Sequence, residues 1–147
     1  MNIYIVRHAE PDYEHDTLTE KGWREAELLS RRLERIPMGT YYVSPLGRAR
    51  DTASLTLQKV GAEATVCPWL REFDKGYATP EAFHPRGMGW DLLPESWVEE
   101  PMYYDPANWF QAPAYRDSGI REVYENVTRN FDGVLEAHGY RREGHLY

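Results

Sequence analysis

The amino-acid sequence predicts an α/β protein built from parallel strand–helix–strand units. Short runs rich in β-branched and aromatic residues alternate with longer segments whose apolar residues recur at helical spacing. At 147 residues the chain has the length of one domain and is long enough to bury a core. We therefore expect a single domain over residues 1–147.

The N-terminal segment is expected to form the first strand. Asn2–Val6 is rich in Ile, Tyr and Val, and the run stops at Arg7 and His8. An acidic loop follows over Ala9–Thr17, and a helix is predicted over Thr19–Arg35, with its first residue as the N-cap. The apolar stripe of this helix consists of Trp23, Ala26, Leu28, Leu29 and Leu33.

The next segment predicts a parallel strand–helix–strand unit. Thr40–Val43 has the composition of a strand. Ser44 and Pro45 then favour a helix start, with serine as the N-cap and proline at the first helical position, and Gly61 is suited to the C-cap. Ala64–Cys67 is the third strand candidate.

Residues 68–115 differ in composition from the rest of the chain. They hold seven of the ten prolines and eleven of the twenty aromatic residues, without a long periodic segment. Because an unstructured loop of this length is uncommon in a compact domain, we expect an irregular insertion packed by its own aromatics over the sheet as a lid. A packing excursion without a functional role is the alternative.

Helical spacing returns in the last part of the chain. A helix is predicted with Ser118 as its N-cap, and it is expected to end at His138-Gly139. Its apolar stripe consists of Ile120, Val123, Tyr124, Val127, Phe131, Val134 and Leu135.

Composition and charge exclude several classes of protein. The net charge of −7 argues against broad electrostatic binding to nucleic acid. No apolar run approaches the roughly 20 residues that span a bilayer, so no membrane partner is expected. Cys67 is the single cysteine, so no internal disulfide can form and a cytoplasmic location is expected.

Four residues are suited to phosphate chemistry. Ligands of parallel α/β sheets bind at the carboxyl ends of the strands, where Arg7 and His8 follow the first one. A neutral imidazole there can attack phosphorus while a guanidinium grips two phosphate oxygens. Arg48 lies one turn into the second helix, from which it can point back over the positive helix end toward an anion. Glu72, just after the third strand, can protonate a leaving oxygen if burial raises its pKa.

Each of these residues, taken singly, also fits a purely structural role. The alternatives are a strand-end histidine bonded to the backbone, a solvated helix arginine and a surface carboxylate. The motifs in combination are more specific.

Three motifs together resemble the histidine phosphatase superfamily, which includes the cofactor-dependent phosphoglycerate mutases. RHAEP matches the opening motif of that family, which ends its first strand. LTEKGWREA and SPLGRARDTA match two further motifs in the same order and at the same spacing. The matching positions are Arg7, His8 and Ala9; Leu18, Thr19, Gly22 and Ala26; and Ser44, Pro45, Arg48, Ala49, Thr52 and Ala53. The resemblance covers residues 3–53 and, more loosely, Leu70, Glu72 and Gly76.

The resemblance implies a three-layer α/β/α sandwich with a mostly parallel central sheet and an active site at its carboxyl edge. It implies that His8 becomes transiently phosphorylated and that Arg7 and Arg48 bind the phosphoryl group. It assigns Glu72 as the acid and then the base. The implied partner is a small-molecule phosphomonoester or phosphate, and no metal or other cofactor is expected.

The sequence departs from the family at the second catalytic histidine. In the family this residue belongs to a His-Gly pair at the end of a late strand. The chain offers His138-Gly139 and His145, and neither follows a strand-like run. We therefore expect a catalytic domain that is incomplete at its C-terminus, or degenerate.

These observations favour a phosphomonoester hydrolase that acts through a phosphohistidine at His8. One alternative is phosphoryl transfer of the phosphoglycerate mutase type, and another is a non-catalytic phosphate-binding or interaction domain. A metallohydrolase is a further alternative, because the segment His8–Asp16 is rich in potential ligands, but an acidic, solvated loop accounts for this segment better.

Overall fold

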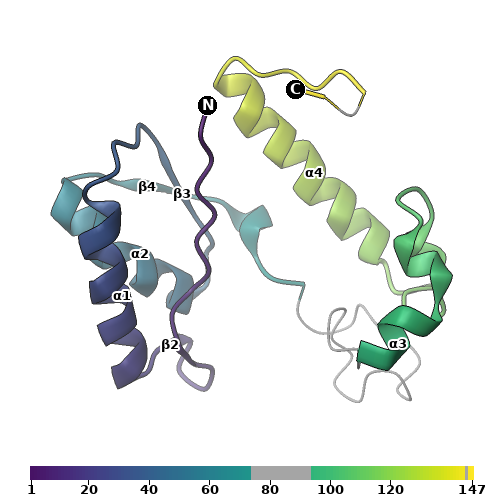
Figure 1. Ribbon diagram of the computed structural model, residues 1–147, viewed down its shortest axis with the longest axis horizontal. Coiled ribbons are helices and arrows are strands. Elements are labelled where there is room, and N and C mark those ends of the chain that lie inside the picture. Colours follow the sequence, from purple (N-terminus) through teal and green to yellow (C-terminus); the bar gives the residue numbers. More distant parts are fainter. Residues whose placement is uncertain (74–93, 145) are drawn as a thin grey trace. The chain divides into compact units, whose positions relative to one another are not determined.

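The computed structural model describes residues 1–73, 94–144 and 146–147, and the chain divides into two compact units, Met1–Arg71 and Glu72–Tyr147 (Figure 1). The architecture is mixed α/β with few and short strands. The first unit contains, in chain order, β1 (Pro11–Asp12), β2 (Thr17–Leu18), α1 (Glu20–Leu33), β3 (Tyr41–Val43), α2 (Gly47–Val60), β4 (Ala64–Val66) and the 3-10 helix η1 (Pro68–Leu70). In the described part of the second unit lie α3 (Pro94–Glu99), the 3-10 helices η2 (Pro101–Tyr104) and η3 (Trp109–Gln111), and α4 (Ile120–Ala137).

The predicted strand–helix–strand unit is confirmed in β3, α2 and β4. β3 pairs in parallel with β4, with Tyr41 opposite Ala64 and Val43 opposite Val66, and α2 connects the two strands (Figure 1). Gly61 ends the helix in the left-handed conformation, at φ 65°, which glycine adopts without steric cost. The unit confirms the parallel arrangement that the sequence predicts.

The helix predicted over residues 19–35 is confirmed as α1, but only part of its predicted apolar stripe is buried, with Ala26 inside and Trp23 and Leu28 exposed. Thr19 caps the helix by accepting a hydrogen bond from the Gly22 N–H at 3.0 Å. The buried positions are Gly22, Ala26 and Ser30, which recur every four residues on one face, and α1 packs against α2. Small side chains allow neighbouring backbone to approach closely, whereas Trp23 and Leu28 are exposed.

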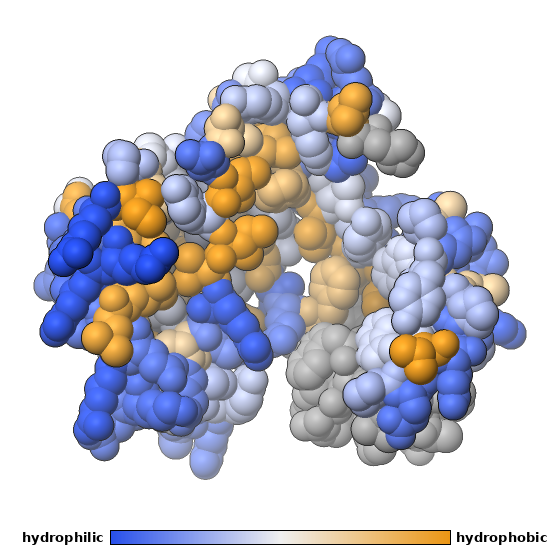
Figure 2. Space-filling model, in the orientation of Figure 1, coloured by the Kyte–Doolittle hydropathy of each residue, from blue (hydrophilic) through white to orange (hydrophobic). Residues whose placement is uncertain are grey.

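The first strand expected at Asn2–Val6 is wrong for this structure. The segment has no strand assignment, and Ile5 is 90% exposed. A strand requires a hydrogen-bonded neighbour as well as a suitable composition, and none of the strands in the described residues pairs with this segment. Figure 2 shows apolar residues at the surface of the first unit, between charged ones.

The predicted start of the second helix is also wrong, by two residues. α2 begins at Gly47 after an extended Leu46, and the Ser44 hydroxyl accepts a hydrogen bond from the Leu46 N–H at 3.4 Å. The Gly47 N–H instead donates to the Asp16 carboxylate, at 2.7 Å. A carboxylate from the acidic loop, residues 9–17, therefore takes over the capping role expected of serine.

The described part of the second unit has a core of its own. Ala112, Ala114, Tyr115 and Ile120 are buried together. Partly buried hydrophobic residues pack against this core: Phe73, Trp97, Tyr103, Trp109 and Phe110. Aromatic packing within the insertion is confirmed for its described residues, and the predicted lid also includes residues 74–93, which lie outside them.

The C-terminal helix is confirmed as α4. It starts at Ile120, after Gly119 in the left-handed conformation, so the N-cap lies one residue beyond the expected Ser118. The Ser118 hydroxyl still accepts a hydrogen bond from the Ile120 N–H, at 3.3 Å. The helix ends at Ala137 with His138 as its C-cap, close to the predicted end at His138-Gly139. Among the helices in the described parts of the chain, none combines the length and the apolar character needed to cross a bilayer.

Candidate phosphate site

His8 lies directly before the acidic loop, and the residue that follows it is hydrogen-bonded to a side chain of α2. Its ring nitrogen Nδ1 is 2.7 Å from the carbonyl oxygen of Ala9. Because a carbonyl can only accept a hydrogen bond, this contact suits a ring with its proton on Nδ1. In the neutral form of that tautomer the lone pair is on Nε2, as a nucleophilic imidazole requires.

The residue after His8 is joined to the beginning of α2. The Ala9 N–H donates to the Thr52 hydroxyl at 3.0 Å, and this hydroxyl donates to the Arg48 carbonyl at 2.7 Å. Thr52 is buried, so both bonds are shielded from water. The link brings the backbone that follows His8 next to the first turn of the helix that carries Arg48.

Arg48 is a buried residue, unlike a solvated helix arginine. Its side chain is 11% exposed, and its Nη1 donates to Asp16 Oδ1 at 2.8 Å. Its guanidinium carbon lies 5.3 Å from the ring centroid of Tyr13, within the range of a cation–π interaction. Both contacts come from the acidic loop that follows His8.

Asp16 is the functional candidate that sequence reasoning did not single out. One carboxylate oxygen accepts from the Gly47 N–H and the other from Arg48. Partial burial opposes ionisation of Asp16, but the hydrogen bonds from Gly47 and Arg48 outweigh it, and its pKa lies below the ordinary value. Asp16 therefore remains ionised and paired under ordinary conditions.

The acidic loop is also fastened to α1. The Thr19 N–H donates to the Glu10 carbonyl at 3.1 Å, and the Glu10 N–H donates to the Glu25 carboxylate at 2.9 Å. Lys21 forms an ion pair with the Glu10 carboxylate, and the hydrogen bonds from Lys21 and Thr19 lower the pKa of Glu10. β1 and β2 form a short antiparallel hairpin within this region. The loop therefore has a defined conformation between the two helices.

The remaining predicted site residues are placed as follows. Arg7 is exposed, in the same unit as His8 and Arg48. Glu72 is exposed and is the first residue of the second unit. His138 is exposed at the end of α4 and follows no strand, and His145 lies outside the described residues. Convergence of Arg7, His8 and Arg48 on one anion, and the role of Glu72, stay predictions.

The carboxylates of the acidic loop are directed to different partners. Glu10 binds Lys21, Asp12 binds His15 at 2.9 Å, and Asp16 binds Arg48. In the described residues, no three His, Cys, Asp or Glu side chains are grouped so that they could hold a metal ion. The structure therefore gives the metallohydrolase alternative no support.

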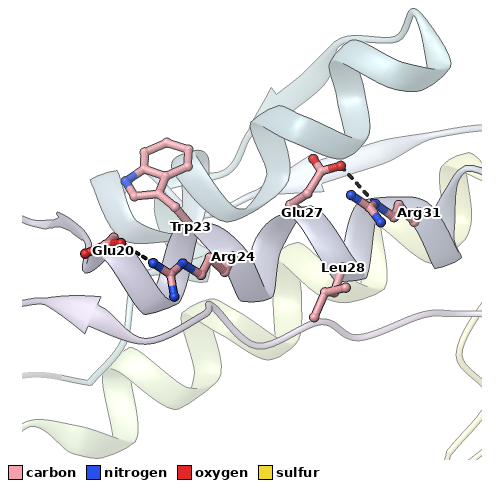
Figure 3. A pocket seen from close by; sticks show the side chains of 6 residues that line it. All are labelled: Glu20, Trp23, Arg24, Glu27, Leu28 and Arg31. Carbon is pink, nitrogen blue, oxygen red and sulfur yellow. Dashed lines mark hydrogen bonds and ion pairs between the residues drawn. The ribbon is translucent and has the colours of Figure 1, made fainter.

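A shallow pocket on the exposed face of α1 lies apart from these residues (Figure 3). Its walls are Glu20, Trp23, Arg24, Glu27, Leu28 and Arg31. The charged side chains pair with each other along the helix, Arg24 with Glu20 and Arg31 with Glu27. The pocket contains none of the predicted site residues, so we assign it no role in phosphate chemistry.

Comparison with known proteins agrees with the class that these motifs define. The model of the histidine phosphatase superfamily (branch 1) matches residues 3–145. The chain therefore belongs to the histidine phosphatase superfamily, whose members act on phosphorylated small molecules. This membership implies the fold of that superfamily for the chain.

Curated relatives match part of the chain. A protein of Cronobacter sakazakii named "Probable phosphoglycerate mutase GpmB" is 32% identical over 85 residues, which are 52% of this chain and 40% of the relative. Its namesake in Photorhabdus laumondii is 31% identical over the same shares. The 2,3-bisphosphoglycerate-dependent phosphoglycerate mutase of Thermoplasma acidophilum is 31% identical over 84 residues, 50% of this chain and 42% of the relative. The chain thus spans about two fifths of the length of these relatives.

Proposed function

We propose that the protein is a phosphomonoester hydrolase that works through a phosphohistidine on His8. The observation that carries the proposal is the hydrogen-bonded link from Ala9 through Thr52 to the backbone of Arg48, which joins two family motifs that are distant in sequence. The contact of His8 Nδ1 with the Ala9 carbonyl supports it, because a proton on Nδ1 leaves the lone pair of the neutral ring on Nε2. Membership of the superfamily supplies the class of substrate.

In the proposed reaction, Nε2 of His8 attacks phosphorus, and the phosphorus–oxygen bond to the leaving alcohol breaks. Glu72 gives its proton to the leaving oxygen and becomes a carboxylate. This carboxylate then accepts a proton from water, whose oxygen attacks the phosphohistidine and releases phosphate and neutral His8. Arg7 and Arg48 neutralise the charge on the phosphoryl oxygens, the contribution on which phosphoryl transfer depends most.

A mutase is the second candidate, favoured by the names of the relatives. Its first half-reaction is the same. The difference is that a hydroxyl group of a substrate, rather than water, accepts the phosphoryl group from His8. We prefer hydrolysis because residues 68–115 are rich in acidic and bulky aromatic side chains, which suit a sugar phosphate poorly.

The test is to trap phosphate on the protein with a phosphomonoester labelled on phosphorus. We expect label that is stable to alkali and labile to acid on the wild-type chain and on His15→Ala, and none on His8→Ala. His15 is a matched control because it is an exposed histidine in the same loop. Label on His8→Ala would refute the proposal.

Two further outcomes separate the alternatives. Faster transfer of the label to a diol phosphate than to water would establish the mutase. A chain that binds phosphate without labelling, with unchanged affinity in His8→Ala, would establish a non-catalytic phosphate-binding domain.

A further inference from the structure

The Arg48 guanidinium is held on two sides by the acidic loop. Asp16 accepts a hydrogen bond from its Nη1 at 2.8 Å, and the Tyr13 ring lies 5.3 Å from its central carbon. The side chain of Arg48 is 11% exposed, whereas that of Asp16 is 44% exposed. The buried side chain of Arg48 is therefore held by two side chains that are more exposed than it is.

The backbone at this contact is strained and tightly packed. Asp16 has φ 47°, in the left-handed region that aspartate tolerates better than most residues. A Cβ on Gly47 would lie 1.9 Å from the Asp16 carbonyl oxygen, so only glycine permits this approach of the loop to α2. Strained conformations of this kind persist where the surrounding structure holds them, often at functional sites.

An arginine that binds a phosphoryl group gains from being held in advance. Its free side chain loses rotamer freedom on binding, and a fixed guanidinium has already lost it. A guanidinium has five N–H donors in a fixed fork, and the bond to Asp16 uses one of its amino groups. We propose that Asp16 and Tyr13 are positioning residues that hold the Arg48 guanidinium in place to bind a phosphoryl group. This inference rests on the proposed function, because it assigns phosphate binding to Arg48.

Two effects of Asp16 on an anion have opposite signs. Its negative charge, close to the phosphate site, repels the anion. Its hydrogen bonds orient Arg48 and favour binding. Asp16→Asn removes the charge and replaces one of the two accepting oxygens by an NH2 group, so either the Gly47 N–H or Arg48 faces a donor where it had an acceptor. Charge alone predicts tighter phosphate binding by this variant, whereas positioning predicts weaker binding.

The experiment is calorimetric titration of the full chain with inorganic phosphate. We expect Asp16→Asn to weaken phosphate binding by about tenfold, because a charge-assisted hydrogen bond that positions Arg48 is lost. Asp12→Asn removes the same charge from the same loop but faces His15, and should leave the affinity unchanged. Tyr13→Leu should weaken binding by about two- to fivefold, as expected for an exposed cation–π contact.

A rescue variant separates positioning from a general structural role. Tyr13 is 65% exposed, so its substitution should leave the thermal unfolding midpoint unchanged. Tyr13→Phe keeps the ring and should restore the affinity that Tyr13→Leu loses. If Asp16→Asn does not fold, the comparison of Tyr13→Leu with Tyr13→Phe tests the positioning role by itself. Equal phosphate affinities of these two variants would overturn the inference.

The outcomes distinguish this inference from the proposed function. If the wild-type chain binds no phosphate, or if Arg48→Ala binds it as well as wild type, phosphate binding by Arg48 is wrong and the inference fails with it. If Arg48→Ala loses binding while Asp16→Asn binds phosphate equally or more tightly, only the positioning role is wrong.

Discussion

Replacing Gly22 by alanine should destabilise the first unit, although the same substitution stabilises most helix interiors. A Cβ at this position would lie 2.2 Å from the Glu10 carbonyl oxygen and 3.1 Å from the Leu18 Cβ. The carbonyl belongs to the backbone and accepts the Thr19 N–H, so it cannot move without breaking that bond. The acidic loop would therefore separate from the start of α1.

The magnitude follows from three contributions. Alanine gains at most about 1 kcal/mol over glycine here, because that value applies to helix interiors and Gly22 lies in the first turn of α1. Loss of the Thr19–Glu10 hydrogen bond costs about 1 kcal/mol, and the steric overlap about 1–3 kcal/mol. The net effect is a loss of about 1–4 kcal/mol in the free energy of unfolding of this unit.

The assay is hydrogen exchange of the α1 amides, combined with urea denaturation followed by circular dichroism. Gly133→Ala is the matched control, because Gly133 lies inside α4 and its added Cβ would meet no atom within 4 Å. This control should stabilise α4 by about 0.5–1 kcal/mol. Shifts of the same sign and size in both variants would refute the reasoning, because helix propensity would then outweigh the contact with Glu10.

Three further predictions concern single groups. Thr52→Val should lower the free energy of unfolding by about 1–3 kcal/mol, because the Ala9 N–H loses its acceptor. The control Ser54→Ala, at an exposed position of α2, should change the stability in urea little. Equal effects of the two substitutions would contradict a role of the Thr52 hydroxyl. Asp16 has a lowered pKa in the folded chain, so the stability it contributes is present above the ordinary pKa of 3.8 and is lost as the pH falls through the folded value. The free energy of unfolding should therefore fall more steeply with decreasing pH below pH 4 in wild type than in Asp16→Asn, and equal slopes would exclude this contribution. Burial raises the pKa of the Cys67 thiol, so a thiol reagent should react slowly until urea is added, and fast reaction of the native chain would show an exposed thiol.

Features that depend on neighbouring residues in the sequence could be predicted. The Thr19 cap, the left-handed Gly61 and the end of α4 at His138 each arise from local backbone chemistry, and each is found where expected. The parallel pair β3–β4 could also be predicted, because a strand, a helix and a strand in succession have a strongly favoured connection.

Features that depend on distant partners could not be predicted. The composition of Asn2–Val6 suits a strand but cannot show whether another strand pairs with it. Ser44 is a sound local cap, yet Asp16, 31 residues from Gly47 in the sequence, reaches the helix end instead. The buried face of α1 was predicted only in part: Ala26 is buried as expected, but hydrophobicity also favours the exposed Trp23 and overlooks the small residues Gly22 and Ser30, which close packing requires.

The candidate site shows the same division. Arg7, His8, Arg48 and Glu72 are predicted from motifs and stay predictions as site residues, and the structure adds burial and an ion pair for Arg48. Asp16 was missed because an acidic loop residue looks solvated in the sequence. Its positive φ, its cap on α2 and its contact with Arg48 exist only once the loop meets the helix.

The central claim is that two guanidinium groups and one imidazole form a single receptor for a tetrahedral anion. A crystal structure of the chain with tungstate tests it most directly, because the anomalous signal of tungsten locates the anion independently of the protein. We expect the oxygens of tungstate within about 3 Å of Arg7 and Arg48 nitrogens, with the metal facing Nε2 of His8. Tungstate bound elsewhere, or the three side chains directed to separate surfaces, would contradict the account.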